Sequence, residues 1–165
     1  MKHSISVALM FSLFAFPLVS SAQSFDQEFV ETAGQGSAAE VEFGRLAQER
    51  AESEEVKSFG NRMVQDHQMA LQDLKSAASE AGVQAPSGLG AEHRSTKQRL
   101  SQLQGSEFDR EYMSLMVEDH HNDVELFRQA DELAEHESLK AYASKTLPVL
   151  QEHLQQAEKI SAAVR

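Results

Sequence analysis

Apolar side chains recur every three or four residues through most of this sequence, and this spacing constrains the fold more than any other feature. One series is Val56, Gly60, Met63, His67, Leu71 and Leu74. Two later series are Met113, Met116, His120, Val124 and Phe127, and then Leu139, Ala143, Thr146, Leu150, His153, Ala157, Ile160 and Val164. Such a period places the residues on one face of a helix, whereas a half-buried strand alternates every second residue. The 165 residues include only 3 prolines and 8 glycines, so the sequence predicts an all-α fold.

Capping residues, glycines and prolines indicate where these helices begin and end. The expected helices cover residues 26–50, 54–82, 91–104, 106–136 and 138–164. Ser53 is the expected N-cap of the second helix, and Asp109 is the expected capping-box partner of Ser106. The first helix is expected to weaken around 34–37, and Pro148 to bend the last helix one turn before His153. Because most connections are short, the prediction is an antiparallel up-down four-helix bundle with a short extra helix in the long loop.

The N-terminal segment differs from the rest of the chain. Lys2 and His3 precede an apolar run, and Ser20, Ser21 and Ala22 offer the small residues of a cleavage site. This arrangement is typical of a secretory signal peptide. The expected organisation is therefore a signal peptide over residues 1–22 and one helical domain over residues 23–165, exported to the periplasm or cell envelope. An uncleaved N-terminal anchor is the alternative.

Charge and cysteine content narrow the possible partners. The chain has 15 basic and 26 acidic residues and a formal net charge of −11. Nucleic acids and anionic membrane surfaces bind basic faces, so neither is an expected partner, and no stable membrane insertion is expected after signal cleavage. Without cysteine, packing alone must hold the fold in an oxidising compartment, and the available metal ligands are imidazole, carboxylate and thioether.

Several segments resemble one known family. They are residues 39–47 (AEVEFGRLA), 63–67 (MVQDH), 108–112 (FDREY), 116–120 (MVEDH) and 146–154 (TLPVLQEHL). In these segments the chain resembles the bacterial exported proteins of the domain-of-unknown-function 4142 family. The resemblance implies a four-helix, ferritin-like bundle in the periplasm or cell envelope. It does not imply an activity.

Polar residues interrupt the apolar stripes near the helix midpoints. His67, His120 and His153 lie near the middle of three expected helices, and Glu40 lies near the middle of the first. In an antiparallel bundle the midpoints of all helices share one layer, and an error of a few residues shifts this depth by only about 4 Å. The sequence therefore predicts a mid-core set of three imidazoles and one carboxylate. This set suits one zinc, copper or iron ion.

Two alternatives remain for these residues. The histidines and Glu40 could satisfy one another through hydrogen bonds, in which case the protein is a non-catalytic structural or interaction bundle without metal. The other alternative concerns Met63 and Met116, which lie four residues before His67 and His120 on the same faces. Their sulfur atoms could join a copper(I) site, although methionine at this spacing also fills cores.

Two classes of enzyme are disfavoured by the same pattern. Ferritin-like di-iron sites use a Glu-x-x-His motif, but Val64, Val117 and Leu150 stand three residues before the three histidines. Hydrolase elbows and phosphate-binding loops are also missing from the sequence. An oxidoreductase acting at the histidine cluster stays open, although no further acid or base can be recognised.

Overall fold

The computed structural model describes residues 24–164. Within this range the chain forms α-helices and no strands, which confirms the predicted all-α class. The helices are α1 (Phe25–Arg50), α2 (Glu54–Glu80), α3 (Ala91–Leu100), α4 (Gly105–Leu133) and α5 (Glu137–Ala163). The predicted signal peptide and its cleavage site lie outside the described residues.

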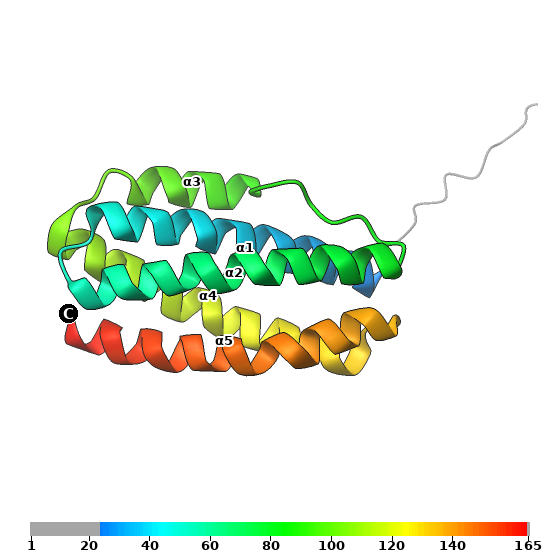
Figure 1. Ribbon diagram of the computed structural model, residues 1–165. Helices are drawn as coiled ribbons and strands as arrows, with labels where there is room; N and C mark the ends of the chain where they lie inside the picture. The colour runs from blue at the N-terminus through cyan, green and yellow to red at the C-terminus, as the bar shows by residue number, and fades with distance from the viewer. Residues whose placement is uncertain (1–23, 165) are drawn as a thin grey trace, which may run out of the picture.

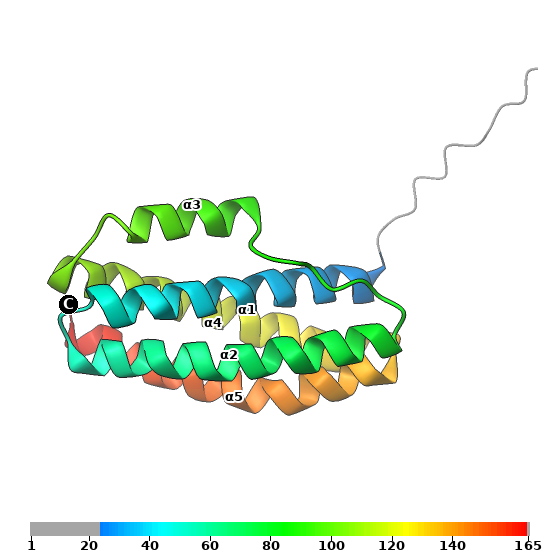
Figure 2. The same ribbon diagram turned by 45° about the horizontal axis from the view of Figure 1, so that its top comes forward.

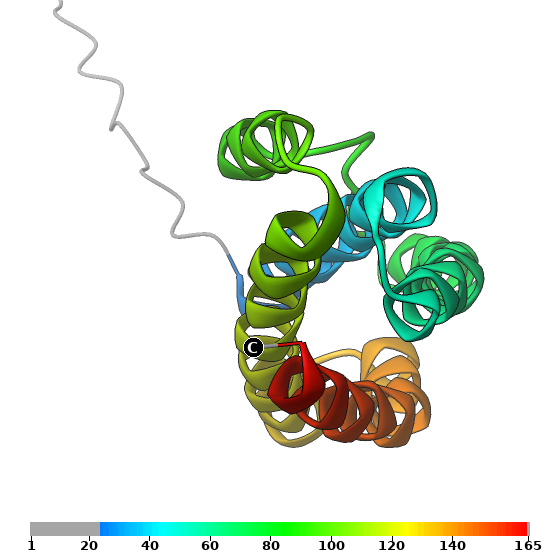
Figure 3. The same ribbon diagram turned by 90° about the vertical axis from the view of Figure 1, so that its left-hand side faces the viewer.

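The four long helices form a bundle around one core. Seen end-on, α4, α1, α2 and α5 surround the centre in that order, and α3 lies outside them beside α1 and α4 (Figure 3). Short connections join α1 to α2 and α4 to α5, and the long segment after α2 crosses the outside of the bundle to reach α3 (Figures 1 and 2). The α1–α2 pair and the α4–α5 pair each pack closely, and the two pairs meet along α2–α5 and α1–α4.

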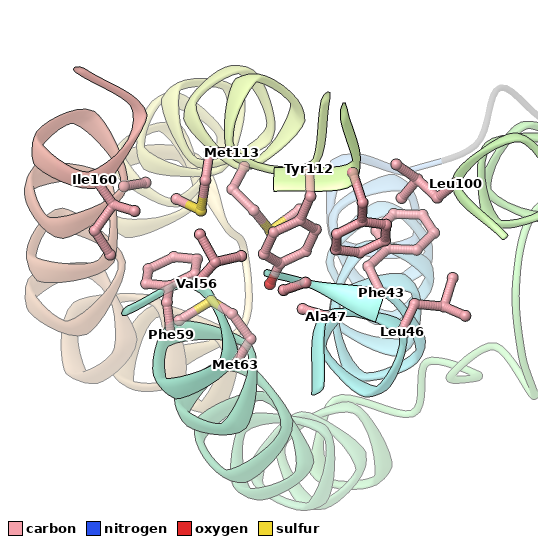
Figure 4. Close-up of a cluster of buried hydrophobic side chains, with 14 of the residues drawn as sticks. Phe43, Leu46, Ala47, Val56, Phe59, Met63, Leu100, Tyr112, Met113 and Ile160 are labelled. Atoms are coloured by element: carbon pink, nitrogen blue, oxygen red, sulfur yellow. The ribbon is translucent and has the colours of Figure 1, made fainter. Parts of the chain in front are cut away.

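The apolar core is divided into two clusters along the bundle. The first apolar cluster contains Phe43, Phe59, Tyr112, Met113 and Ile160 (Figure 4). It comes from the C-terminal halves of α1 and α5 and the N-terminal halves of α2 and α4, together with Leu100 at the end of α3. The second apolar cluster comes from the opposite halves, including Phe29, Leu74, Phe127 and Leu139. The polar side chains of the helix midpoints lie between the two clusters.

Two buried aspartates tie each helix pair to the other. Asp109 in α4 accepts hydrogen bonds from the backbone N–H groups of Glu52 and Ser53, at 3.1 and 2.8 Å. These residues belong to the α1–α2 connection. Ser53 is the N-cap residue of α2, as expected, although its side chain makes no capping hydrogen bond. The expected capping box is wrong, because α4 begins at Gly105 with Gln104 as its N-cap and Asp109 binds the other helix pair.

The second aspartate makes the equivalent contact at the other end of the bundle. Asp26 in α1 accepts from the backbone N–H groups of Glu135 and His136, at 2.8 and 3.1 Å. These residues join α4 to α5. Each helix pair therefore has an aspartate near its start, and the carboxylate of this aspartate binds the segment that joins the two helices of the other pair. The same kind of contact thus occurs at both ends of the bundle.

Glycines act at two places where a side chain would not fit. At the end of α2, Gly82 has a positive φ of 69°, and the Val83 N–H donates to the Ala78 carbonyl at 2.9 Å, as in a Schellman cap. Between α1 and α2, a Cβ atom on Gly44 would lie 2.5 Å from the carbonyl oxygen of Gly60. These glycines therefore let the two backbones approach closely.

The helices are continuous at both positions where an irregularity is expected. The weakening of the first helix is wrong, because α1 continues without a break through residues 34–37. Gly34 is packed against the ring of Pro86, which leaves no room for a side chain at that position. Pro148 lies inside α5, on the exposed side of the helix, and α5 continues through it.

Among residues 24–164, no helix has the length and apolarity needed to cross a membrane.

Candidate metal centre

A buried polar layer lies between the two apolar clusters. Glu40 of α1 is 2% exposed, His67 of α2 is 3% exposed, and His120 of α4 and His153 of α5 are both fully buried. Each comes from the middle of a different long helix. The structure thus brings together the four residues that the sequence places at one depth.

The three imidazoles face one another. Their ring centroids are 5.3 to 5.7 Å apart. Each ring offers one nitrogen to a common centre, and these nitrogens all lie within 4.8 Å of one another. A tetrahedral ion with metal–nitrogen bonds of about 2.0–2.1 Å needs ligand nitrogens roughly 3.4 Å apart. The nitrogens would therefore have to approach one another by up to about 1.4 Å to close around an ion.

Glu40 contacts the outer edges of two of these rings. Its Oε2 atom lies 2.9 Å from His67 Nδ1, and its Oε1 atom lies 3.4 Å from His120 Nδ1. Neither Glu40 oxygen is well enough aligned with a ring N–H to form a hydrogen bond. The hydroxyl oxygen of Ser37 also lies near this ring, 3.4 Å from His67 Nδ1. Because a carboxylate can only accept, the proton of neutral His67 is favoured on Nδ1, which leaves the lone pair on Nε2.

The other two rings are oriented in the same way. His120 Nδ1 donates to the backbone carbonyl of Met116 at 2.9 Å. His153 Nε2 donates to the Asp66 carboxylate at 2.8 Å. Since both partners are acceptors only, neutral His120 has its lone pair on Nε2 and neutral His153 has its lone pair on Nδ1.

These assignments leave three buried lone pairs without a donor. His67 Nε2, His120 Nε2 and His153 Nδ1 are all buried and have no hydrogen-bond partner among the described residues. Buried polar atoms are nearly always satisfied, and an unsatisfied one costs about 1–3 kcal/mol. The three nitrogens belong to a single cluster and have the form of unprotonated imidazole that binds metals.

The charges around the cluster keep it ready to bind a cation. Burial lowers the pKa of His153 to about 4, the neighbouring His67 adds to this shift, and the hydrogen bond to Asp66 opposes it. Burial also lowers the pKa of His120, although the charge of Glu40 opposes that shift. Burial works against ionisation of Glu40, but the adjacent His67 and His120 outweigh it and lower its pKa to about 2. At neutral pH the layer therefore combines neutral His120 and His153 with an anionic Glu40.

Asp66 is part of an ion-pair chain at the edge of the layer. Arg62 Nε donates to Asp66 at 3.2 Å, and the same guanidinium reaches Gln156 and Glu152 of α5, both at 3.0 Å. Burial opposes the ionisation of Asp66, but hydrogen bonding to His153 and Arg62 lowers the pKa of its carboxyl. Arg62 therefore holds the carboxylate that orients His153.

The two candidate methionines and two histidines outside the layer have other surroundings. Met63 and Met116 are fully buried within the first apolar cluster, and the Met116 backbone carbonyl is the group that contacts His120. His121 is exposed and lies 3.5 Å from Glu158. His136 accepts a hydrogen bond from the Ser138 N–H at 3.2 Å, so it caps α5.

Two clefts approach the polar layer along the lines where the helix pairs meet. The α2–α5 cleft has a volume of about 280 Å³ and is lined by His67 and His153 among others. The second cleft, between α1, α3 and α4, has a volume of about 380 Å³ and reaches Glu40 from the opposite side. The layer is therefore buried but close to the surface on both sides.

Comparison with known proteins places the chain in a family. Residues 17–160 match the family model described as a domain of unknown function, DUF4142. The chain belongs to the DUF4142 family. None of the curated proteins matches this DUF4142 protein.

Three solved structures share the fold of this DUF4142 domain. A DUF305 protein from Streptomyces coelicolor is 16% identical with a TM-score of 0.72, covering 87% of this chain and 94% of its own. A DUF305 fragment from Deinococcus radiodurans is 15% identical with a TM-score of 0.72, covering 86% and 98%. CopM in its Cu(I)-bound form is 18% identical with a TM-score of 0.67, covering 83% and 95%. At these identities the likeness concerns the fold alone.

Sequence reasoning missed two residues of this DUF4142 site. Asp66 precedes His67 in the sequence, but it contacts His153 on another helix. Ser37 comes three residues before Glu40 and lies beside His67 Nδ1. The available signal was helical phase, because Asp66 points about 100° away from His67 on α2 and so lies toward α5 rather than toward the centre of the core.

Proposed function

We propose that this protein is an exported cell-envelope or periplasmic bundle that binds one transition-metal ion through His67, His120 and His153. In this proposal the bundle is antiparallel, up-down and ferritin-like. Residues 1–22 act as its signal peptide, and residues 23–165 form the mature domain. Glu40 and Asp66 bind the outer nitrogens of the histidines and orient them.

The observation that carries the proposal is the set of three buried ring nitrogens that have no hydrogen-bond partner among the described residues. A metal-free hydrogen-bond network needs a donor for each of them, and the described residues provide none. A metal ion would satisfy all three at once. The outer contacts support the same function, since metal-binding histidines usually donate their other N–H to a carboxylate or a backbone carbonyl.

The ligand chemistry favours zinc or copper over iron. Three imidazoles suit zinc and copper, whereas iron sites in proteins of this architecture add several carboxylates. Glu40 and Asp66 are both engaged with the far side of the rings. Among proteins of similar fold, CopM has been solved in a Cu(I)-bound form, so copper is included in the test with zinc.

The test measures metal content and affinity. The mature protein should purify with, or take up, one equivalent of zinc or copper by elemental mass spectrometry. Replacing any one of the three histidines with alanine should remove most of the affinity, and a second replacement should add little, because the three ligands act as a unit. The matched control is His121→Ala, which changes an exposed histidine next to His120 and should leave binding unchanged.

A different result would favour the structural alternative. If the well-folded wild-type protein binds neither metal more tightly than the triple-alanine variant does, the cluster is not a metal site. The histidines would then serve packing and hydrogen bonding in an envelope bundle without metal.

A further inference from the structure

A metal ion in this site would have only three protein ligands. The carboxylates in contact with the three histidines are those of Glu40 and Asp66, and each lies against an outer nitrogen of a ring. Met63 and Met116 belong to the first apolar cluster. Closed structural zinc sites have four protein ligands, whereas sites with three keep a position for water or another small molecule. The site therefore has the donor set of an open site.

The α2–α5 cleft leads from the surface to this site. Among its lining residues are His67 and His153, two of the three proposed ligands. On the opposite side, the second cleft reaches Glu40 but none of the three histidines, and Glu40 and Ser37 of α1 lie against the outer edge of His67. An additional ligand on the metal is therefore expected from the cleft side.

The size and charge of the cleft select the kind of ligand. Its volume of about 280 Å³ is just below the range of about 300–1,000 Å³ that is usual for small-molecule sites, which favours a ligand of a few atoms. Its four charged side chains are Arg62, Lys145, Asp66 and Asp73, so their formal charges cancel. A divalent ion beside this cleft would make it positive, and a small anion would offset that charge.

We propose that the metal bound by His67, His120 and His153 keeps a coordination position open toward the α2–α5 cleft, where a small monoanion binds it. This inference rests on the proposed metal site and goes beyond it. It makes the protein a receptor for an exogenous small ligand rather than a closed metal store.

The test uses the cobalt(II)-loaded mature protein, because cobalt(II) replaces zinc and reports its coordination through its visible spectrum. Sodium azide is the probe anion. Azide should change the cobalt spectrum in a saturable manner, with one azide bound per cobalt. Cobalt bound with no response to azide would overturn this inference and leave the metal site standing, whereas failure to bind cobalt, zinc or copper would overturn both.

Variants test whether the ligand enters through the cleft. Ala70→Phe fills the half-buried interior of the cleft, and Val149→Trp fills its rim, where Val149 is 36% exposed. Each should weaken azide binding about tenfold or more while leaving cobalt affinity within about twofold. If Ala70→Phe impairs folding, Val149→Trp alone decides the question.

The matched control is Ala141→Phe, which places the same ring on the exposed face of α5 outside the cleft. It should leave azide binding unchanged. Azide binding that is equally tight in the folded cleft variants and in the control would overturn the proposed route.

Discussion

Asp66 on α2 accepts a hydrogen bond from His153 on α5, at 2.8 Å, rather than from its sequence neighbour His67. Adjacent residues on a helix point about 100° apart. His67 therefore faces the core while Asp66 faces the neighbouring α5. This contact joins the two helix pairs and decides which nitrogen of His153 is free.

Removing the Asp66 carboxylate should weaken metal binding without abolishing it. In Asp66→Ala, His153 loses the acceptor that holds its proton on Nε2, so its lone pair on Nδ1 is no longer fixed. Loss of such an orienting partner typically costs 10–100-fold in metal affinity, measured by competition with a chromophoric chelator. The control is Asp73→Asn, which breaks the exposed pair with Lys145. Equal affinities in the two variants would argue against an orienting role.

Glu40 should also act as an orienting residue rather than as a ligand. Glu40→Gln keeps the size of the side chain but removes the negative charge that lies against Nδ1 of His67 and His120. We expect about a 10–100-fold loss of metal affinity, which is smaller than the loss in His67→Ala. A loss as large as that of His67→Ala would instead indicate that Glu40 binds the metal directly.

Metal should stabilise the fold, because the proposed ligands belong to both helix pairs. His67 lies in the α1–α2 pair, and His120 and His153 lie in the α4–α5 pair. At a free metal concentration about 100 times the Kd, binding adds about 2.7 kcal/mol. A chelator should then lower the thermal midpoint by roughly 5–10 °C, followed by circular dichroism. The midpoint of His67→Ala should not respond to the chelator.

The buried caps should contribute to stability but not to metal binding. Asp109→Ala leaves the N–H groups of Glu52 and Ser53 without their charged acceptor. We expect a loss of about 2–4 kcal/mol in the free energy of unfolding, measured by urea denaturation, with metal affinity unchanged. The control, Glu107→Ala, removes an exposed acid from the first turn of α4. A similar loss in both variants would indicate a helix-dipole effect instead.

In the metal-free protein, His153 should become protonated only near pH 4. Its pKa falls from an ordinary value of 6.5 to about 4 because the ring is buried. The unfolded chain therefore takes up this proton first, and the contribution of His153 to stability decreases by about 3 kcal/mol as the pH falls from 6.5 to 4. The ring protons of His153, followed by NMR, should report this titration directly.

Comparison with a variant removes the contributions of titrating groups that do not interact with His153. Burial and the nearby Glu40 raise the pKa of Asp119 to about 7, which gives stability the opposite dependence on pH. The Asp119 contribution cancels when wild type is compared with His153→Leu. The stability of wild type relative to this variant should therefore decrease between pH 6.5 and pH 4. A constant difference across this range would contradict the lowered pKa.

The helices and the depth of the polar residues could be predicted because both depend on local sequence. A period of three to four residues indicates a helix and its buried face, and Gly82 marks the end of α2. The position of His67, His120 and His153 along their helices then places them in one layer. The expected weakness at 34–37 was wrong because packing compensates for the low helix propensity of glycine, as the contact of Gly34 with Pro86 illustrates.

The sequence by itself thus determined the all-α class, the helix positions and the polar layer in the core, since a helix repeats regularly and its buried face can be read from spacing. Only the tertiary structure decided which groups meet across helices. The capping of residues 52–53 by Asp109, the pairing of Asp66 with His153 and the two clefts depend on how α1, α2, α4 and α5 are rotated and spaced. Differences of a few ångströms determine these contacts, and they arise from the packing of side chains distant in the chain, which helical periodicity does not encode.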